Sequence, residues 1–333
     1  MSSLESYWYR PNRIVWLLLP LSWLYCLVAI IRRKLYQLNI KKSYAARAPV
    51  VVIGNIVAGG SGKTPLLIAL CEFVQARGYK AGVVSRGYGG TFTGVKQVAE
   101  TDDAALVGDE PLMVHQRTGV PVVVGADRVA AISYLLANNE CDIVFSDDGL
   151  QHYRMRRDLE LAVVDVERRF GNGFCIPAGP LRERISRLNE VDLIIYSGNT
   201  GSSDGKEAGT EECSYQLKIT KIQRLNSKEC RDISDFSGNE VHAVAGIGNP
   251  SRFFRQLENQ GLSVRSHAFS DHHRYRQKDF SGWTEECIIM TEKDSVKCRN
   301  LPLTDAWVVT VNSELSTGLK ARLEDILLPL LPE

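Results

Sequence analysis

A strand, a glycine-rich turn and a helix are predicted in direct succession between residues 51 and 70, in the segment VVIGNIVAGGSGKTPLLIAL. The turn ends in Gly62, Lys63 and Thr64, which is the end of the phosphate-binding pattern G-x-x-x-x-G-K-[ST]. In such a loop, backbone N–H groups and a helix N-terminus surround the phosphates, the lysine bridges them, and the hydroxyl binds Mg²⁺. Because this loop joins a buried strand to the next helix, the segment points to an α/β sheet fold.

The first glycine of that pattern is replaced by Val57. Gly59 and Gly60 still allow close approach of the backbone to phosphate, and Gly54 can contribute to the turn. The alternative is a glycine-rich turn that contains Gly-Lys-Thr by chance. We expect the nucleotide to be bound by Val57, Ala58, Gly59, Gly60, Ser61, Gly62, Lys63 and Thr64.

Apolar runs alternate with helical patterns after residue 48, in βαβ order. Continuous Val- and Ile-rich runs are typical of parallel strands covered on both faces. They predict a P-loop NTPase-type α/β/α sandwich over residues 48–213, linker strands over 214–240, and a second smaller α/β domain over 241–333. Strands are expected at 50–53, 81–84, 120–124, 141–145, 159–164 and 191–196, then near 242–246, 262–269, 286–290 and 306–311; helices are expected at 64–77 and 127–138, and near 251–260 and 318–330.

The N-terminal segment predicts a membrane anchor helix within residues 1–35. Residues 14–31 contain no charge, and at 18 residues they approach the minimum length for crossing a bilayer. Aromatic side chains suited to an interface lie within and beside this run, and a basic connector, residues 32–48, follows it. The basic residues favour placement of the rest of the chain on the cytoplasmic side. A buried core helix is the alternative, and whether the helix spans the membrane or lies in its interface stays open.

Composition excludes few classes of function. Forty basic and 39 acidic residues give no argument for a nucleic-acid partner. The eight cysteines form no C-x-x-C pair, so neither a zinc site nor a disulfide framework is indicated, and a reducing cytoplasm fits best.

Acidic and basic motifs follow several predicted strands. Asp147 and Asp148 end a strand where the carboxyl edge of the sheet should face the phosphate loop, which suggests a Mg²⁺ site; an acidic turn is the alternative. Asp109 begins a predicted helix in GDEP, where a helix dipole alone would explain it. His272 in SDHHRY could accept a proton or could lie in a solvated loop. The loop at 170–184 carries Arg182, Glu183 and Arg184 and could contact an anionic substrate.

In this order, the motifs resemble those of one family, the tetraacyldisaccharide 4′-kinases. The resemblance covers nearly the whole chain and is weakest at 198–240. It rests on LLLPLSWLY at 17–25, VVIGNIVAGGSGKTP at 51–65, VVSRGYGG at 83–90, GDEP at 108–111, DDGLQHYR at 147–154, RRFGNG at 168–173, PAGPLRER at 177–184, AGIGNPSRFF at 245–254 and MTEKDSVKCR at 290–299.

The resemblance implies a fold, a reaction and a set of site residues. The family transfers the γ-phosphate of ATP, with Mg²⁺, to the 4′-hydroxyl of a tetraacylated disaccharide 1-phosphate, a lipid A precursor at the inner membrane of bacteria. Its fold joins two α/β/α domains by a two-stranded linker and adds an N-terminal membrane helix. Carried over, Asp109 and His272 resemble its catalytic dyad, and Glu183 a further active-site acid. Thr64, Asp147 and Asp148 resemble its metal and phosphate ligands, with the division between the two aspartates open.

Two further expectations follow from this interpretation. The protein is expected to be a monomer at the cytoplasmic face of the inner membrane, with its lipid substrate in the bilayer. The competing hypothesis is a membrane-associated P-loop ATPase or switch that acts on a protein partner. That class often carries a second lysine near the start of the loop, which this chain lacks at 57–60.

Overall fold

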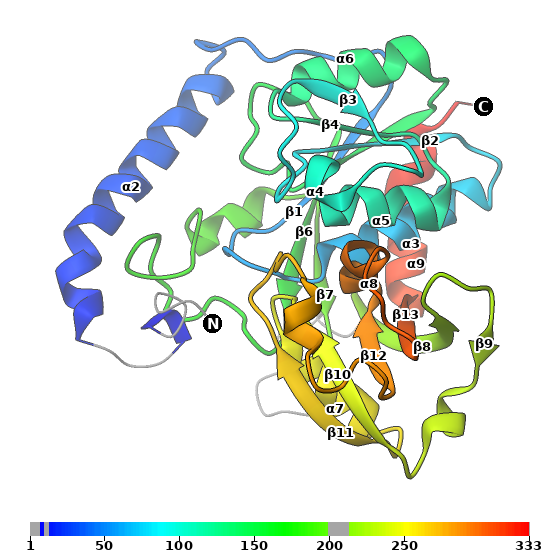
Figure 1. Ribbon diagram of the computed structural model, residues 1–333. Helices are drawn as coiled ribbons and strands as arrows, with labels where there is room; N and C mark the ends of the chain where they lie inside the picture. The colour runs from blue at the N-terminus through cyan, green and yellow to red at the C-terminus, as the bar shows by residue number, and fades with distance from the viewer. Residues whose placement is uncertain (1–6, 10–12, 199–212, 333) are drawn as a thin grey trace.

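The structure is a computed structural model, and it describes residues 7–9, 13–198 and 213–332 (Figure 1). Its strands form one mixed sheet in the order β11-β10-β12-β13-β8-β7-β6-β1-β5-β2-β4-β3, with β9 paired to β8 alone. Residues 199–212, at the end of the predicted first domain (48–213), lie outside the described residues.

The first half of the sheet contains the six predicted buried strands and one short strand, β3, that was not predicted. Its elements are β1 Val50–Gly54, α3 Lys63–Gln75, β2 Ala81–Ser85, β3 Val95–Gln97, α4 Ala104–Val107, α5 Asp109–Thr118, β4 Val122–Gly125, α6 Arg128–Asn138, β5 Ile143–Asp147, β6 Leu159–Asp165, η1 Ile185–Glu190 and β7 Leu193–Ser197. Strand β1 lies between β5 and β6 and is parallel to both. Val51 and Ile53 face one core while Val50 and Val52 face the other, which explains the uninterrupted apolar run.

The second half continues the same sheet. It comprises β8 Ser214–Arg224, β9 Cys230–Arg231, η2 Ile233–Phe236, β10 Glu240–Ala245, α7 Pro250–Glu258, β11 Ser263–Ala268, η3 Gln277–Phe280, β12 Ile288–Thr291, α8 Glu292–Cys298, β13 Ala306–Leu315, α9 Thr317–Leu327 and η4 Leu328–Leu330. The long antiparallel pair β8–β13 joins the two halves, and β10, β11 and β12 are parallel.

The last helix returns to the first half of the molecule. Leu319, Leu323 and Leu327 of α9 are fully buried in the core that also contains Leu66 and Leu70 of α3. Figure 1 shows α9 beside α3. One sheet and one shared core cross the boundaries predicted at 213/214 and 240/241. The division into domains at these positions therefore stays a prediction.

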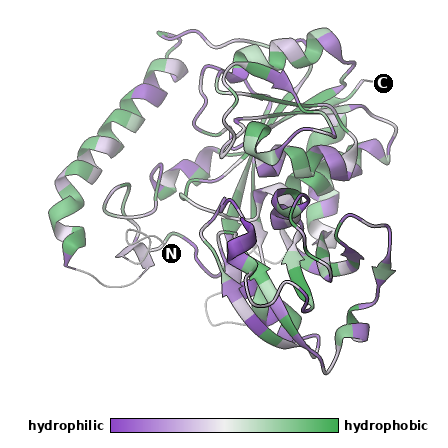
Figure 2. Cartoon of the chain, viewed as in Figure 1, coloured by the Kyte–Doolittle hydropathy of each residue, from purple (hydrophilic) through white to green (hydrophobic). Residues whose placement is uncertain are grey.

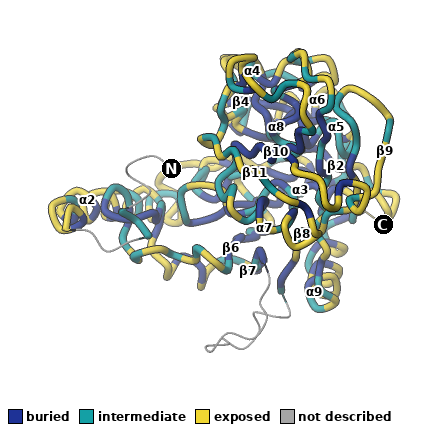
Figure 3. The backbone as a smooth tube through the Cα atoms, turned by 60° about the horizontal axis from the view of Figure 1, so that its bottom comes forward, coloured by how far each residue is buried: buried dark blue, intermediate teal, exposed yellow. Residues whose placement is uncertain are grey.

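An apolar helix, α2 (Ile14–Gln37), lies along one side of the molecule (Figures 1 and 2). The helix continues to Gln37, beyond residue 32, where we expected the basic connector to begin. The predicted start of the connector was therefore wrong. Its length, and the mean hydropathy of 2.4 over its most apolar 18-residue window, would allow it to cross a membrane, and only 22% of that window is buried. The alternative of a buried core helix therefore does not fit (Figure 3).

One face of α2 contacts the loop before η1. Val15 and Leu19 pack with Ala178, and the Ser22 hydroxyl donates to the Cys175 carbonyl oxygen at 2.7 Å. Cys26 and Cys175 form a disulfide with their Cα atoms 6.4 Å apart, a pairing that the scattered cysteine positions did not indicate. The helix is therefore fixed to the body of the protein along its length.

Candidate active site

The phosphate loop connects β1 to α3, as predicted. Gly62 precedes α3 with a positive φ of 85°, and a Cβ there would lie 2.5 Å from the Tyr215 hydroxyl oxygen and 2.6 Å from Ser197 Oγ. Tyr215 of β8 donates its hydroxyl proton to the Gly62 carbonyl. Only glycine fits this backbone conformation and this space, which explains why the phosphate-binding pattern has glycine at position 62.

Val57, the unusual residue of the motif, occupies an extended part of the loop. It forms an isolated antiparallel bridge with Leu181, and the next N–H, of Ala58, donates to the Pro180 carbonyl at 2.8 Å. Extended backbone accepts a β-branched residue without strain, so the missing glycine has a structural reason. Asn55 completes the loop by donating to Ser61 Oγ at 2.9 Å.

A loop from the second half of the chain touches the phosphate loop. A Cβ on Gly248 would lie 2.9 Å from the Gly60 Cα, so the two backbones are in contact. The Arg168 guanidinium donates to the Gly248 carbonyl and lies beside Gly59. The candidate site is therefore built from both halves.

Asp147 and Asp148 lie at the end of β5 with different surroundings. Asp148 receives two hydrogen bonds from Arg182 Nη1, at 2.7 and 2.8 Å, and its Oδ1 lies 3.4 Å from Lys63 Nζ. Burial alone would raise the pKa of Asp148, but Lys63 and Arg182 hold it well below its usual value. Asp148 is therefore an ionised partner of the loop lysine.

Asp147 is more deeply buried than its neighbour. Burial and the charge of Glu110 raise the pKa of Asp147, against the lowering effect of Lys63. Its Oδ2 accepts a hydrogen bond from Ser85 at 3.4 Å, while Oδ1 is buried without a hydrogen-bond partner. A divalent cation would satisfy that oxygen and favour the ionised form.

Thr64, whose hydroxyl is expected to bind the metal, lies buried in the first turn of α3. No cluster of three or more His, Cys, Asp or Glu is arranged for a metal among the described residues. Mg²⁺ in P-loop proteins takes most of its ligands from phosphate, water and one hydroxyl, so one orphaned carboxylate oxygen and Thr64 fit such a site.

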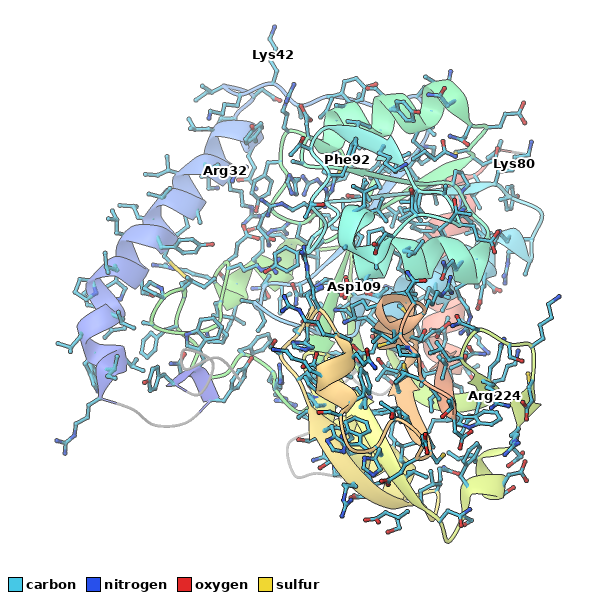
Figure 4. The ribbon with its side chains drawn as sticks, viewed as in Figure 1. Arg32, Lys42, Lys80, Phe92, Asp109 and Arg224 are labelled. Atoms are coloured by element: carbon cyan, nitrogen blue, oxygen red, sulfur yellow. A yellow bond between two sulfur atoms is a disulfide. The ribbon has the colours of Figure 1, made fainter. Side chains whose placement is uncertain are left out.

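Asp109 and His272 are brought together from positions far apart in the sequence. Asp109 begins α5, and His272 lies in the loop between β11 and η3. His272 Nδ1 lies 2.9 Å from Oδ1 and 3.1 Å from Oδ2 of Asp109, and the Tyr88 ring packs edge-on against the imidazole at 4.8 Å. Figure 4 shows Asp109 where the two halves meet.

The Asp109 carboxylate is ionised although it is buried. Desolvation would raise its pKa, but the hydrogen bond from His272 and the charges of Lys293 and Lys297 together lower it to about 2. Both lysines come from α8, Lys297 with its Nζ 3.5 Å and Lys293 with its Nζ 4.0 Å from Asp109 Oδ2. The charge of Glu110, next to Asp109, raises the pKa of Asp147, whereas the charge of Lys63 lowers it, so both groups lie near Asp147 and the dyad is close to the phosphate loop.

Glu183 is bound by two side chains from the segment that follows β5. Its two carboxylate oxygens accept hydrogen bonds from Tyr153 and from Gln151 Nε2, the latter at 3.0 Å. Gln151 also donates to the Asn55 carbonyl, at 3.3 Å. A direct role as an active-site acid stays a prediction, and these contacts favour a positioning role behind the phosphate loop.

The lysines of α8 were not predicted from the sequence. MTEKDSVK begins where the strand expected at 286–290 ends, and no short motif gives a role to its two lysines. Their spacing of four residues, which places both on one face of a helix, was the available signal.

Comparison with known proteins identifies the family. A family model described as Tetraacyldisaccharide-1-P 4'-kinase matches residues 14–328. A tetraacyldisaccharide 4'-kinase of Hahella chejuensis is 43% identical over 327 residues, covering 96% of this chain and 95% of the relative. Another, of Shewanella sp. (strain W3-18-1), is 44% identical over 312 residues and covers 93% and 90%.

A solved structure shares the fold. The crystal structure of "apo" form LpxK from Aquifex aeolicus in complex with ATP superposes with a TM-score of 0.79 at 23% identity, covering 96% of this chain and all of that one. This match confirms the predicted fold class, and the sequence matches confirm the predicted resemblance. The chain belongs to the tetraacyldisaccharide-1-P 4'-kinase family.

Proposed function

We propose that this protein transfers the γ-phosphate of ATP to the 4′-hydroxyl of a tetraacyldisaccharide 1-phosphate. The observation that carries the proposal is family membership over residues 14–328, with relatives that match nearly end to end. The arrangement of a phosphate loop beside a buried Asp–His pair supports the same reaction class.

The phosphate loop and its neighbours account for nucleotide binding in this proposal. Backbone N–H groups of the loop and the N-terminus of α3 surround the phosphates, and Lys63 bridges them. Thr64 and Asp147 would hold Mg²⁺, while Asp148 holds Lys63 and Arg182 in place. A bound Mg²⁺ would neutralise charge that develops on the transferred phosphoryl group.

The Asp109–His272 pair supplies a base for the acceptor. A sugar hydroxyl is a weak nucleophile, and a positioned imidazole can accept its proton during phosphoryl transfer. The ionised Asp109 accepts a hydrogen bond from Nδ1 and stabilises the imidazolium that forms. Because His272 comes from the second half and Asp109 from the first, the base exists only when the halves are in contact.

Helix α2 places the enzyme at the membrane that holds its lipid substrate. Large apolar side chains cover its outer face, including Trp16, Leu17 and Trp23, each more than 60% exposed. Its inner face packs on the body from Val15 to Cys26, and Arg33 forms an ion pair with Glu190. Since both ends contact the body, we propose that the helix lies in the interface, on the cytoplasmic side, rather than crossing the bilayer.

The test is transfer of labelled phosphate from ATP to the tetraacyldisaccharide 1-phosphate by the purified full chain. Lys63→Ala and His272→Ala should abolish or strongly reduce transfer, and Lys320→Ala, at an exposed position on α9, should not. ATP hydrolysis without any lipid product by the unmodified protein would reject the kinase and favour the ATPase or switch hypothesis.

A further inference from the structure

Helix α8 presents two lysines, one turn apart, to the Asp109–His272 pair. Lys293 Nζ lies 2.7 Å from Glu110 Oε1, 2.9 Å from Asp271 Oδ1 and 3.5 Å from His272 Nε2. Its side chain is only 12% exposed, so these contacts replace its hydration. The ammonium group therefore connects α5, the loop that carries His272, and α8.

Lys297 approaches the same pair from the other side. Its Nζ lies 3.5 Å from Asp109 Oδ2 and 2.9 Å from Asp294 Oδ1. Asp294 is fully buried, and its Oδ2 accepts hydrogen bonds from the Gly246 N–H at 2.9 Å and the Thr291 hydroxyl at 2.6 Å. The Asp294 carboxylate therefore holds both Lys297 and Gly246, and Gly246 begins the loop that contacts the phosphate loop.

The local structure of α8 fixes where both ammonium groups lie. Thr291 caps the helix by accepting from the Asp294 N–H, and Glu292 forms an ion pair with Arg117 of α5 at 3.0 Å. The helix follows β12, so the buried strand sets its starting point. Lys293 and Lys297 project from one face of this short, anchored helix.

These contacts determine which nitrogen of His272 carries the proton. A carboxylate only accepts hydrogen bonds, so the ring nitrogen facing Asp109, Nδ1, must donate. An ammonium only donates, so the ring nitrogen facing Lys293, Nε2, must hold a lone pair. The two neighbours therefore favour one tautomer, with Nε2 available as the base.

The remaining charges around His272 do not reverse this preference. Asp109 and Glu110 face it from α5, and Lys293 and Lys297 from α8. Its own loop contributes Asp271, 3.7 Å from Nε2, and Arg274, which donates to the Gly89 carbonyl; the loop after β2 contributes the uncharged Tyr88 ring. Asp271 is itself bound by Lys293, so its charge is offset next to the imidazole.

We infer that Lys293 and Lys297 are positioning residues that hold the proton of the Asp109–His272 pair on Nδ1 and keep Nε2 unprotonated, so that its lone pair can accept the proton of the acceptor hydroxyl. The inference rests on the proposed function for what Nε2 does, but the tautomer itself can be measured without substrate. Lys297 keeps Asp109 an acceptor, and Lys293 makes protonation of Nε2 unfavourable.

The first experiment measures the tautomer directly. The full chain, labelled with ¹⁵N-histidine and solubilised in detergent, is compared with Lys293→Met by the ring ¹⁵N chemical shifts of His272, assigned by its loss in His272→Gln. The unmodified protein should show one protonated and one lone-pair nitrogen above neutral pH. Lys293→Met should show a mixture of tautomers or a protonated ring at the same pH, and Lys293→Arg should restore the original signals.

The second experiment measures the acid limb of the pH–rate profile for phosphoryl transfer. Lys293→Met should move it about one unit to higher pH, about a tenfold loss of rate on that limb, because a cation is removed and two carboxylates lose their partner. Glu110→Gln should move the acid limb to lower pH, because the positive charge of Lys293 is then less neutralised and disfavours protonation of His272 more strongly. Lys320→Met, which removes an exposed charge on α9, should leave profile and rate unchanged.

These opposite shifts separate positioning from a merely structural effect. Equal loss of rate at every pH in Lys293→Met, with unchanged His272 signals, would overturn the inference. If Lys293→Met does not fold, Glu110→Gln decides, and an unmoved limb there has the same consequence. Failure of the unmodified protein to phosphorylate the lipid would reject the proposed function, whereas the tautomer measurement would still stand.

Discussion

The buried charge of Asp109 should stabilise the folded protein in a pH-dependent way. Its pKa falls from the ordinary 3.8 to about 2, and each unit corresponds to about 1.4 kcal/mol, so the ionised form contributes about 2.5 kcal/mol. Because the folded pKa lies below the unfolded one, this contribution is complete above about pH 5 and is lost as the pH falls toward 2. About half should be gone at pH 3.

The perturbation is Asp109→Asn, which keeps the shape of the side chain and removes its charge. Lys297 then keeps Asp294 as a partner but loses Asp109, and His272 loses an ionised acceptor. We expect the free energy of unfolding at pH 7 to fall by about 2.5 kcal/mol and the difference from the unmodified protein to shrink on acidification.

The assay is urea denaturation in detergent at several pH values between 7 and 3, with Asp325→Asn as the matched control. Asp325 lies exposed on α9, so its replacement should change stability by less than about 0.5 kcal/mol at every pH. A difference for Asp109→Asn that stays constant from pH 7 to pH 3 would refute the electrostatic argument. A difference near zero at pH 7 would refute it as well.

Three other outcomes follow from the site and from the proposed role of helix α2 at the membrane. Gly62→Ala should abolish ATP binding in an equilibrium binding assay, while Gly78→Ala, whose φ is also positive but whose Cβ would meet no atom within 4 Å, should bind normally at a stability cost of about 1 kcal/mol. Because burial raises the pKa of Asp147, the Mg²⁺ concentration needed for half-maximal transfer should fall as the pH rises from 6 to 8, and Asp147→Asn should remove that trend. Replacing Trp16 and Leu17 by Glu should weaken sedimentation with anionic vesicles more than tenfold, since each exposed side chain contributes about 2 kcal/mol in the interface; unchanged sedimentation would refute the role of this face.

Local patterns were sufficient to predict the elements with a strong periodic signal. The apolar runs around Val51 and Phe145 gave buried strands because both faces of β1 and β5 are covered. The start of α5 at Asp109 was indicated by the acidic residues and the proline that follow Gly108. Gly62 and Lys63 could be assigned because their role depends on backbone geometry that a short motif encodes.

Long-range contacts could not be predicted in the same way. Lys293 and Lys297 belong to a seven-residue helix, too short for a hydrophobic period, and their meaning depends on Asp109, far away in the sequence. The disulfide between Cys26 and Cys175 likewise depends on how α2 packs, which spacing does not reveal. The pairing of Asp109 with His272 came from the family resemblance rather than from residue chemistry, which left His272 open.

The return of α9 to the first core has a consequence for biosynthesis. The nascent chain emerges from the ribosome N-terminus first, so α3 and β1 leave long before Leu319, Leu323 and Leu327, which complete their core, have been synthesised. Until then the apolar surface beside the phosphate loop stays uncovered, in a chain that already contains the exposed apolar helix α2. Early contact of α2 with the membrane would hold the unfinished chain away from other nascent proteins. A chain that stops before residue 317 would contain every residue of the phosphate loop but would lack α9, which covers part of the core beside it.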